Sequence, residues 1–365
     1  MKRLTNRSNR IALFIVLFAT YQANCEESSR SDLFRGVLLA AKDVTSEQLS
    51  RFAEEDFTCA ILVIDGGKPA EIETQVRAAD LIKASKLQLF YWIEVARCPK
   101  LADEHPEWMA SLQTHDEWRR FFPKAPRPKA DEVAKTYPWV PILSREPFTA
   151  QLERVRRLLH DKPVPNGVFL NDLQGAPSAC GCGSPLCRWT SDYGRRRTTT
   201  PIGDDAATLF VNAVKKTLPN SQVIPVWTTE CEKHDGAEDG LCAGVGCFDG
   251  ICWKAYTKQL MPLQQTSRTL AVLTPFREFE RELPIYGGTA GWIRHAVESF
   301  AKIPPKHGGE SIPASRLIAV VQGWNVTKAE IDAQIEMATK SGVNGYVVAM
   351  EKIEQSWEPK VIRWR

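Results

Sequence analysis

The sequence has 365 residues, of which 47 are Lys or Arg and 44 are Asp or Glu, so its formal net charge at pH 7 is only +3. A charge this small does not indicate a nucleic-acid partner, because such partners bind strongly basic surfaces. The length is sufficient for one large domain, or two ordinary ones, with a substantial hydrophobic core.

The N-terminus has the pattern of a signal peptide. Residues 1–10 include four basic side chains and no acidic one, and an apolar run follows at 11–19. This run is too short to cross a bilayer, but it has the length of a signal-peptide core. We therefore expect residues 1–25 to be removed on export and 26–365 to form one secreted or periplasmic domain. A lipoprotein acylated at Cys25 is the alternative. No later segment has the ~20 apolar residues of a membrane helix.

Eight short apolar segments alternate with segments of helical periodicity along the rest of the chain. The segments predict strands at 36–41, 59–65, 87–95, 167–173, 223–228, 269–276, 317–324 and 345–350. Helices are predicted at 45–54, 71–85, around 148–159, and at 204–218, 292–300 and 328–339. Apolar strands that alternate with helices indicate a parallel sheet buried on both faces.

Eight such units predict an α/β fold of the (β/α)₈ TIM-barrel type. An insertion at about 97–147 follows the third strand, and cysteine-rich loops follow strands four and five. The alternative is a doubly wound open sheet. No glycine-rich phosphate loop follows the first strand, which argues against a nucleotide-binding version of that fold.

The active site of such a barrel is built at the C-terminal ends of its strands. Acidic, amide and aromatic residues recur at these positions in the sequence. Glycoside hydrolysis needs a pair of carboxyl groups, and flat aromatic rings pack against sugars. The alternative is that strand ends are polar only because they meet water.

Asp172 and Glu230 are the preferred catalytic couple, because they end neighbouring strands that lie ~5 Å apart. Glu94 is a third catalytic candidate. We leave the retaining or inverting outcome open. His105 and His115 in the insertion could act as acid or base, although a surface-loop role is the alternative. The predicted substrate-binding residues are Tyr91, Trp92, Asn171, Gln174, Trp227, Arg277, Trp324, Asn325 and Glu351.

Three stretches carry a resemblance to a known family: YWIEVAR at the end of strand three, HPEW after it, and GVFLNDLQG at strand four. They resemble secreted glycoside-hydrolase-like (β/α)₈ proteins of planctomycete-type bacteria. The resemblance implies a TIM barrel, a carbohydrate ligand and glycosidase activity. The acids after strands four and five also resemble the alpha-amylase layout, which implies that Asp172 is the nucleophile and Glu230 the proton donor.

Eight cysteines are predicted at the same rim of the barrel, and in an exported chain they would form up to four disulfides. We leave their pairing open, because eight cysteines allow 105 connectivities. The alternative is a structural zinc site, for which His234 lies near Cys231; no other cofactor is predicted. Cys59 opens the second strand and is expected to be a buried free thiol. The eight are Cys98, Cys180, Cys182, Cys187, Cys231, Cys242, Cys247 and Cys252.

Two functions fit these observations. The first is a secreted glycoside hydrolase that cleaves a glycan with paired carboxylates at the rim of the barrel. The alternative is a non-catalytic barrel that binds a glycan or an exported protein through its disulfide- or zinc-stapled rim. The sequence leaves open whether the chain is active, which sugar and linkage it recognises, and its oligomeric state.

Overall fold

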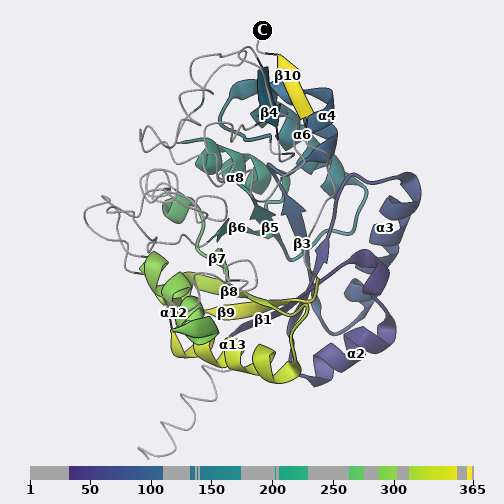
Figure 1. The fold of residues 1–365 in the computed structure, drawn as a ribbon. Coiled ribbons are helices and arrows are strands. Elements are labelled where there is room, and N and C mark those ends of the chain that lie inside the picture. The colour runs from purple at the N-terminus through teal and green to yellow at the C-terminus, as the bar shows by residue number, and fades with distance from the viewer. Residues whose placement is uncertain are drawn as a thin grey trace, which may run out of the picture. The chain divides into compact units, whose positions relative to one another are not determined.

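Eight strands form a closed barrel in the computed structural model of the chain (Figure 1). Each strand from β1 to β9 pairs in parallel with the next strand of the barrel. This confirms the predicted TIM-barrel fold and excludes the open sheet. The strands are β1 (Phe34–Leu39), β2 (Cys59–Val63), β3 (Gln88–Glu94), β5 (Gly167–Asn171), β6 (Gln222–Thr228), β7 (Leu270–Leu273), β8 (Leu317–Gln322) and β9 (Gly345–Ala349).

The structure describes most of the barrel and part of its connections. Apart from Leu33 and Phe34, the described residues belong to one compact unit that spans residues 35–365. The barrel closes between β9 and β1, where the Met350 N–H donates to the Leu38 carbonyl at 3.1 Å. The described ranges are 33–109, 132–135, 138, 140–173, 202, 205–228, 263–274, 287–301, 312–351 and 360–363.

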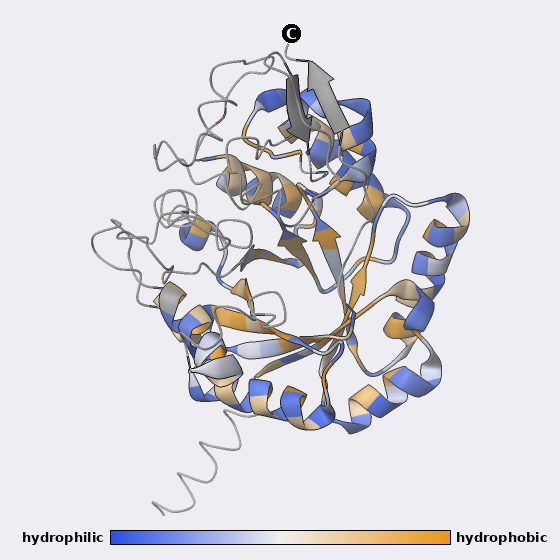
Figure 2. Cartoon of the chain, viewed as in Figure 1, coloured by the Kyte–Doolittle hydropathy of each residue, from blue (hydrophilic) through white to orange (hydrophobic). Residues whose placement is uncertain are grey.

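Amphipathic helices follow the strands. In Figure 2 the outer helices carry many hydrophilic residues, while the strands are mainly hydrophobic. The Thr45 hydroxyl caps α2 by accepting the Gln48 N–H at 3.2 Å, as the sequence predicts. Thr327 and Glu330 form a capping box at the start of α13. The helices are α2 (Ser46–Glu54), α3 (Pro69–Ala84), α6 (Arg145–His160), α8 (Ala206–Thr217), α12 (Gly288–Ala301) and α13 (Lys328–Lys340). No helix in the described ranges is long and apolar enough to cross a membrane.

The alternation of side chains along each strand separates two buried layers. Leu89, Tyr91 and Ile93 of β3 belong to a cluster that also includes Ala79 and Ile82 of α3, so they face the helices. Phe90, Trp92 and Glu94 lie on the opposite face of the same strand and point into the barrel. Phe169 of β5 joins this inner layer, with its ring 5.9 Å from Phe90 and 5.7 Å from Trp92. Only every second residue of a strand points into the barrel, and only those residues can therefore contribute to a site at its rim.

The segment after β3 contains structure that the sequence did not predict. Helix α4 (Pro99–Glu104) is followed by the short strand β4 (Glu132–Lys135). Strand β4 pairs antiparallel with β10 (Lys360–Arg363), which comes from near the C-terminus. A small cluster of buried side chains, Ala102, Met109 and Val140, lies within the same part of the chain. The predicted insertion thus contains secondary structure and a small core of its own.

Candidate active site

Glu94, the last residue of β3, is the centre of a buried hydrogen-bond network. Its side chain is only 5% exposed. The Trp92 indole Nε1–H donates to Glu94 Oε1 at 2.7 Å, because residues two apart on a strand share a face. The Asn171 amide Nδ2 donates to Oε1 at 3.2 Å and to Oε2 at 3.0 Å. Asn171 reaches both oxygens because it is paired with Glu94 across β3 and β5.

Asp172 adds a second carboxyl group to this network. It is 3% exposed and hydrogen bonds to the Glu94 carboxylate. Arg97 lies beside the pair, with its Nε 3.6 Å from Asp172 Oδ2. We call Glu94 and Asp172 the acid pair.

The backbone of Asp172 has an unusual conformation. Its φ is 57°, in the left-handed region, which Asp and Asn tolerate better than most residues. Consecutive residues of a strand point to opposite faces, yet Asn171 and Asp172 both bond to Glu94. Asp172 lies just past the end of β5, where the left-handed turn ends the alternation.

The charge of Glu94 depends on opposing effects. Burial raises the pKa of its carboxyl group, but the Arg97 charge and the hydrogen bonds from Asp172, Trp92 and Asn171 outweigh burial. The pKa of Glu94 is therefore lowered from its ordinary value. We conclude that Glu94 is ionised at neutral pH.

The backbone beneath Glu94 is fixed by Arg154 of α6. Its guanidinium donates to the carbonyl oxygens of Glu94 and Val95, the second at 3.0 Å. Its Nε donates to Gln151 Oε1 at 2.9 Å. The sequence analysis assigned no role to Arg154 or Arg97, because neither residue belongs to a pattern that predicts its long-range partner.

A second group of charged residues follows β1 and β9. Lys42 Nζ lies 2.9 Å from Glu351 Oε1, and Asp43 hydrogen bonds to Glu351. Burial, and then the hydrogen bond and charge of Glu351, raise the pKa of Asp43. The hydrogen bond from Lys42 is the main cause that lowers the pKa of Glu351. The rim thus carries a second pair of carboxyl groups, more exposed than the acid pair, and Glu351 remains a substrate-binding prediction.

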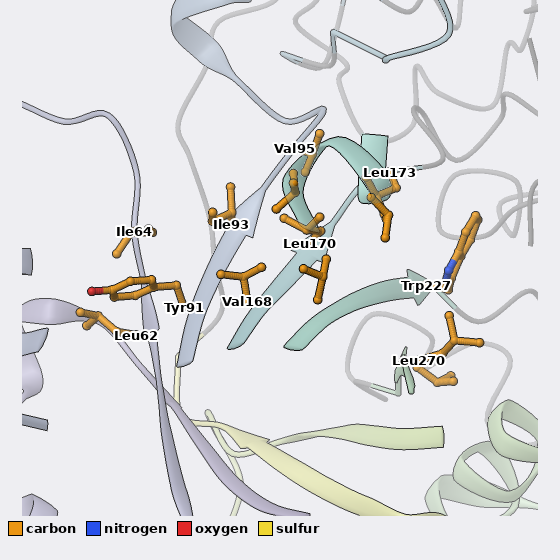
Figure 3. Close-up of a cluster of buried hydrophobic side chains, with 14 of the residues drawn as sticks. Leu62, Ile64, Tyr91, Ile93, Val95, Val168, Leu170, Leu173, Trp227 and Leu270 are labelled. Carbon is orange, nitrogen blue, oxygen red and sulfur yellow. The ribbon is translucent and has the colours of Figure 1, made fainter. Parts of the chain in front are cut away.

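Three predicted aromatic contacts with substrate need correction. Tyr91 faces the helices, and its hydroxyl donates to the Pro163 carbonyl at 2.7 Å. Trp227 belongs to the same outer layer, and Figure 3 shows both residues within that cluster. Trp92 does point into the barrel, but its ring is 1% exposed and stacked on Phe169. It is a hydrogen-bond donor to Glu94 and not an open platform for a sugar.

The remaining predicted site residues are only partly described. Trp324 is half-buried and Asn325 is exposed, both just after β8. His105 lies at the surface, where its ring stacks on Trp108 and its Nδ1 is 3.1 Å from Glu107 Oε1. Outside the described residues lie Gln174, Glu230, Arg277, His115 and His234.

The structure describes two of the predicted cysteines. Cys59 is a buried free thiol, as predicted. Cys98 is also free and buried, which corrects its predicted place in a rim disulfide. Its side chain is enclosed where the chain turns from β3 into α4, and its N–H donates to the Pro138 carbonyl at 2.9 Å. In the described ranges no group of three His, Cys, Asp or Glu could hold a metal ion. Outside those ranges lie Cys180, Cys182, Cys187, Cys231, Cys242, Cys247 and Cys252.

Comparison with known proteins gives no family and only distant structural neighbours. No family model matches the chain, and no curated protein has significant sequence similarity to it. Among solved structures, a class V chitinase from Pseudomonas fluorescens Pf-5 has a TM-score of 0.48 at 12% identity. The match covers 87% of this chain and 95% of the chitinase chain. Alpha-L-fucosidase isoenzyme 2 from Paenibacillus thiaminolyticus has a TM-score of 0.46 at 15% identity, and the match covers 87% of this chain and 46% of the fucosidase chain.

A third match is GH5_18 from Streptomyces cattleya in complex with GlcNAc, with a TM-score of 0.42, 12% identity, and 87% and 70% of the two chains covered. The matches also include the carboxyl transferase domain of a pyruvate carboxylase. Identities and TM-scores this low transfer no activity. The chain is a (β/α)₈ barrel by its own strand pairing, and the solved structures similar to it include glycoside hydrolases.

Proposed function

We propose that the protein is a glycoside hydrolase that acts on a glycan at the C-terminal rim of its barrel. The observation that carries the proposal is the acid pair, in which Glu94 and Asp172 are buried together at the ends of adjacent strands. Adjacent buried carboxyl groups with a cationic neighbour are typical of sites that perform acid–base chemistry. The resemblance noted in the sequence points to the same class of reaction.

The acid pair could supply one of the two carboxyl functions that cleavage of a glycosidic bond needs. An ionised Glu94 would stabilise the positive charge that develops on the sugar in the transition state, or attack its anomeric carbon. The two carboxyl groups are in direct hydrogen-bond contact, closer than the ~5 to 5.5 Å of retaining pairs or the ~6.5 to 9.5 Å of inverting pairs. A third carboxyl group must therefore protonate the leaving oxygen. We propose Glu230 for this role, as in the sequence analysis, and Glu94 in place of Asp172 as the charged partner.

Export and cross-linking are part of the same proposal. The signal-peptide pattern at 1–25 supports a secreted or periplasmic location. In an oxidising compartment the cysteines between 180 and 252 would form disulfides, and a structural zinc is the alternative.

The test compares turnover in matched variants. The purified protein would be assayed against a panel of polysaccharides and aryl glycosides, together with Glu94→Gln, Asp172→Asn and Glu230→Gln. We expect each variant to lose at least ~10²-fold in turnover, as for other acid–base groups, with unchanged circular dichroism. Glu336→Gln, the same chemical change on the outer surface of α13, should keep full activity. Full activity in the three rim variants would refute the proposal.

The direct contact within the acid pair also favours a second candidate, a non-catalytic barrel that binds a glycan or an exported protein. A pair this close does not straddle a sugar, but it does offer a fixed set of hydrogen-bond groups. Isothermal calorimetry on the same glycan panel would distinguish the two. Binding without turnover in the wild-type protein would support the second candidate.

A further inference from the structure

We propose that Trp92 is a positioning residue for the acid pair, whose indole N–H, together with the Asn171 amide, orients the Glu94 carboxylate and holds it in its negatively charged form. The sequence predicts Trp92 as a substrate contact instead. The part of Trp92 in catalysis rests on the proposed function, but its effect on the charge of Glu94 does not.

The geometry favours a negative charge on Glu94. Both oxygens of Glu94 accept bonds from neutral N–H groups: Oε1 from Trp92 at 2.7 Å and from Asn171 at 3.2 Å, and Oε2 from Asn171 at 3.0 Å. An indole nitrogen is a donor only, so it always opposes protonation of the oxygen that it meets. Loss of this donor should therefore make Glu94 easier to protonate.

The position of the indole is itself fixed by packing. Trp92 stacks on Phe169 with an interplanar angle of 20°, and Phe169 contacts Phe90 in the same inner layer. The three rings come from β3 and β5, the two strands that carry the acid pair. The donor is therefore held in place by the aromatic core of the barrel.

Only two charged groups among the described residues act on the carboxyl of Glu94. These are Arg97, which lies after β3, and Asp172, which lies after β5. Arg97 Nε is 3.6 Å from Asp172 Oδ2, so its charge acts on both members of the pair. The indole and amide donors add to the effect of Arg97, because both bond directly to the carboxylate oxygens of Glu94.

A titration tests the effect of Trp92 on the charge of Glu94 without any assay of activity. The protein would be labelled with ¹³C at the glutamate side-chain carboxyl carbons, and the Glu94 signal identified by its loss in Glu94→Gln. We expect this signal to titrate below the ordinary glutamate value of 4.5 in the wild-type protein. Trp92→Phe keeps a ring against Phe169 but removes the N–H, so the midpoint should rise by about 1 to 2 pH units.

Two further variants complete the test. Trp227→Phe removes a buried indole from the outer layer and should leave the Glu94 midpoint unchanged. Asn171→Leu removes the other donor at similar size and should raise the midpoint, which provides a second measurement if Trp92→Phe does not fold. A wild-type midpoint above 4.5, or an unchanged midpoint in both Trp92→Phe and Asn171→Leu, would overturn the proposal.

A measurement of turnover distinguishes this proposal from the proposed function. If a hydrolysed glycan is found, Trp92→Phe should move the acidic limb of the kcat profile upward by the same amount, with little change in KM. If no glycan is hydrolysed while Glu94 titrates as expected, the proposed function fails, and the effect of Trp92 on the charge of Glu94 stands.

Discussion

Lys42 Nζ lies 2.9 Å from Glu351 Oε1, and this ion pair joins the residues that follow β1 and β9, the two strands between which the barrel closes. Asp43 hydrogen bonds to the same Glu351 carboxylate. Two carboxyl groups thus share one hydrogen bond at the barrel seam, as they do in the acid pair, but here a lysine holds the charged member.

We predict that Glu351→Gln lowers the pKa of Asp43. Burial raises this pKa in the wild-type protein, and the hydrogen bond and negative charge of Glu351 raise it further. The variant removes the negative charge, so Asp43 should ionise at lower pH. A ¹³C titration of the aspartate carboxyl carbons would measure the shift, and Glu336→Gln provides the control. A higher or unchanged pKa would show that Glu351 does not act on Asp43.

Arg154→Met is expected to destabilise the protein by about 1 to 3 kcal/mol. The change leaves the carbonyl groups of Glu94 and Val95 without the guanidinium that bonds them. Urea unfolding followed by circular dichroism would measure the loss. Arg157→Met on the exposed side of the same helix should change the free energy of unfolding by less than about 0.5 kcal/mol. Equal losses in the two variants would contradict a specific role of Arg154.

Gly167→Ala is expected to disturb the inner aromatic layer. A Cβ at this position would lie 2.5 Å from the Phe90 ring and 2.8 Å from the Gln222 carbonyl oxygen. Overpacking of this kind costs about 1 to 3 kcal/mol in the free energy of unfolding. Gly66→Ala has no atom within 4 Å of the new Cβ and is the matched control. Thermal unfolding of both variants would check the difference, and an unchanged midpoint in Gly167→Ala would contradict this packing.

The two described cysteines should be inert in the native protein and reactive after unfolding. Burial raises the pKa of the Cys59 thiol to about 12, so little thiolate exists at pH 8. We expect alkylation in denaturant without reductant to modify both Cys59 and Cys98, as detected by peptide mass spectrometry. A disulfide-linked Cys98 peptide would contradict its free state in the structure.

The fold was predictable because each barrel strand is a short apolar run bounded by polar residues. The predicted run at 317–324, for example, contains β8 (Leu317–Gln322), and 345–350 contains β9 (Gly345–Ala349). The pairing of β4 with β10 was not predictable. Both strands have four residues and lie far apart in the sequence, so no local pattern joins them.

The site was predictable only in part, because a list of strand ends ignores which face each side chain occupies. The two-residue spacing of Trp92 and Glu94 does indicate a shared face, and the same rule assigns Tyr91 to the other face. No such rule was available for Trp227, because β6 is apolar on both faces. Arg97 lies beside Asp172, which is distant in the sequence, and Arg154 bonds to backbone carbonyl groups of β3 and the residue after it. A single sequence carries no signal for such contacts.

The left-handed backbone at Asp172, with φ of 57°, limits which residues can replace it. Asn and Gly adopt this conformation readily, whereas β-branched residues are strained there. A saturation library at position 172 would therefore separate two requirements. Asn retains the turn without the acid, Gly retains the turn without a side chain, and Glu restores an acid at the cost of strain. The three variants would be ranked by stability and, separately, by turnover. The first ranking would show how strongly the backbone conformation constrains this position, and the second how strongly the carboxyl group does.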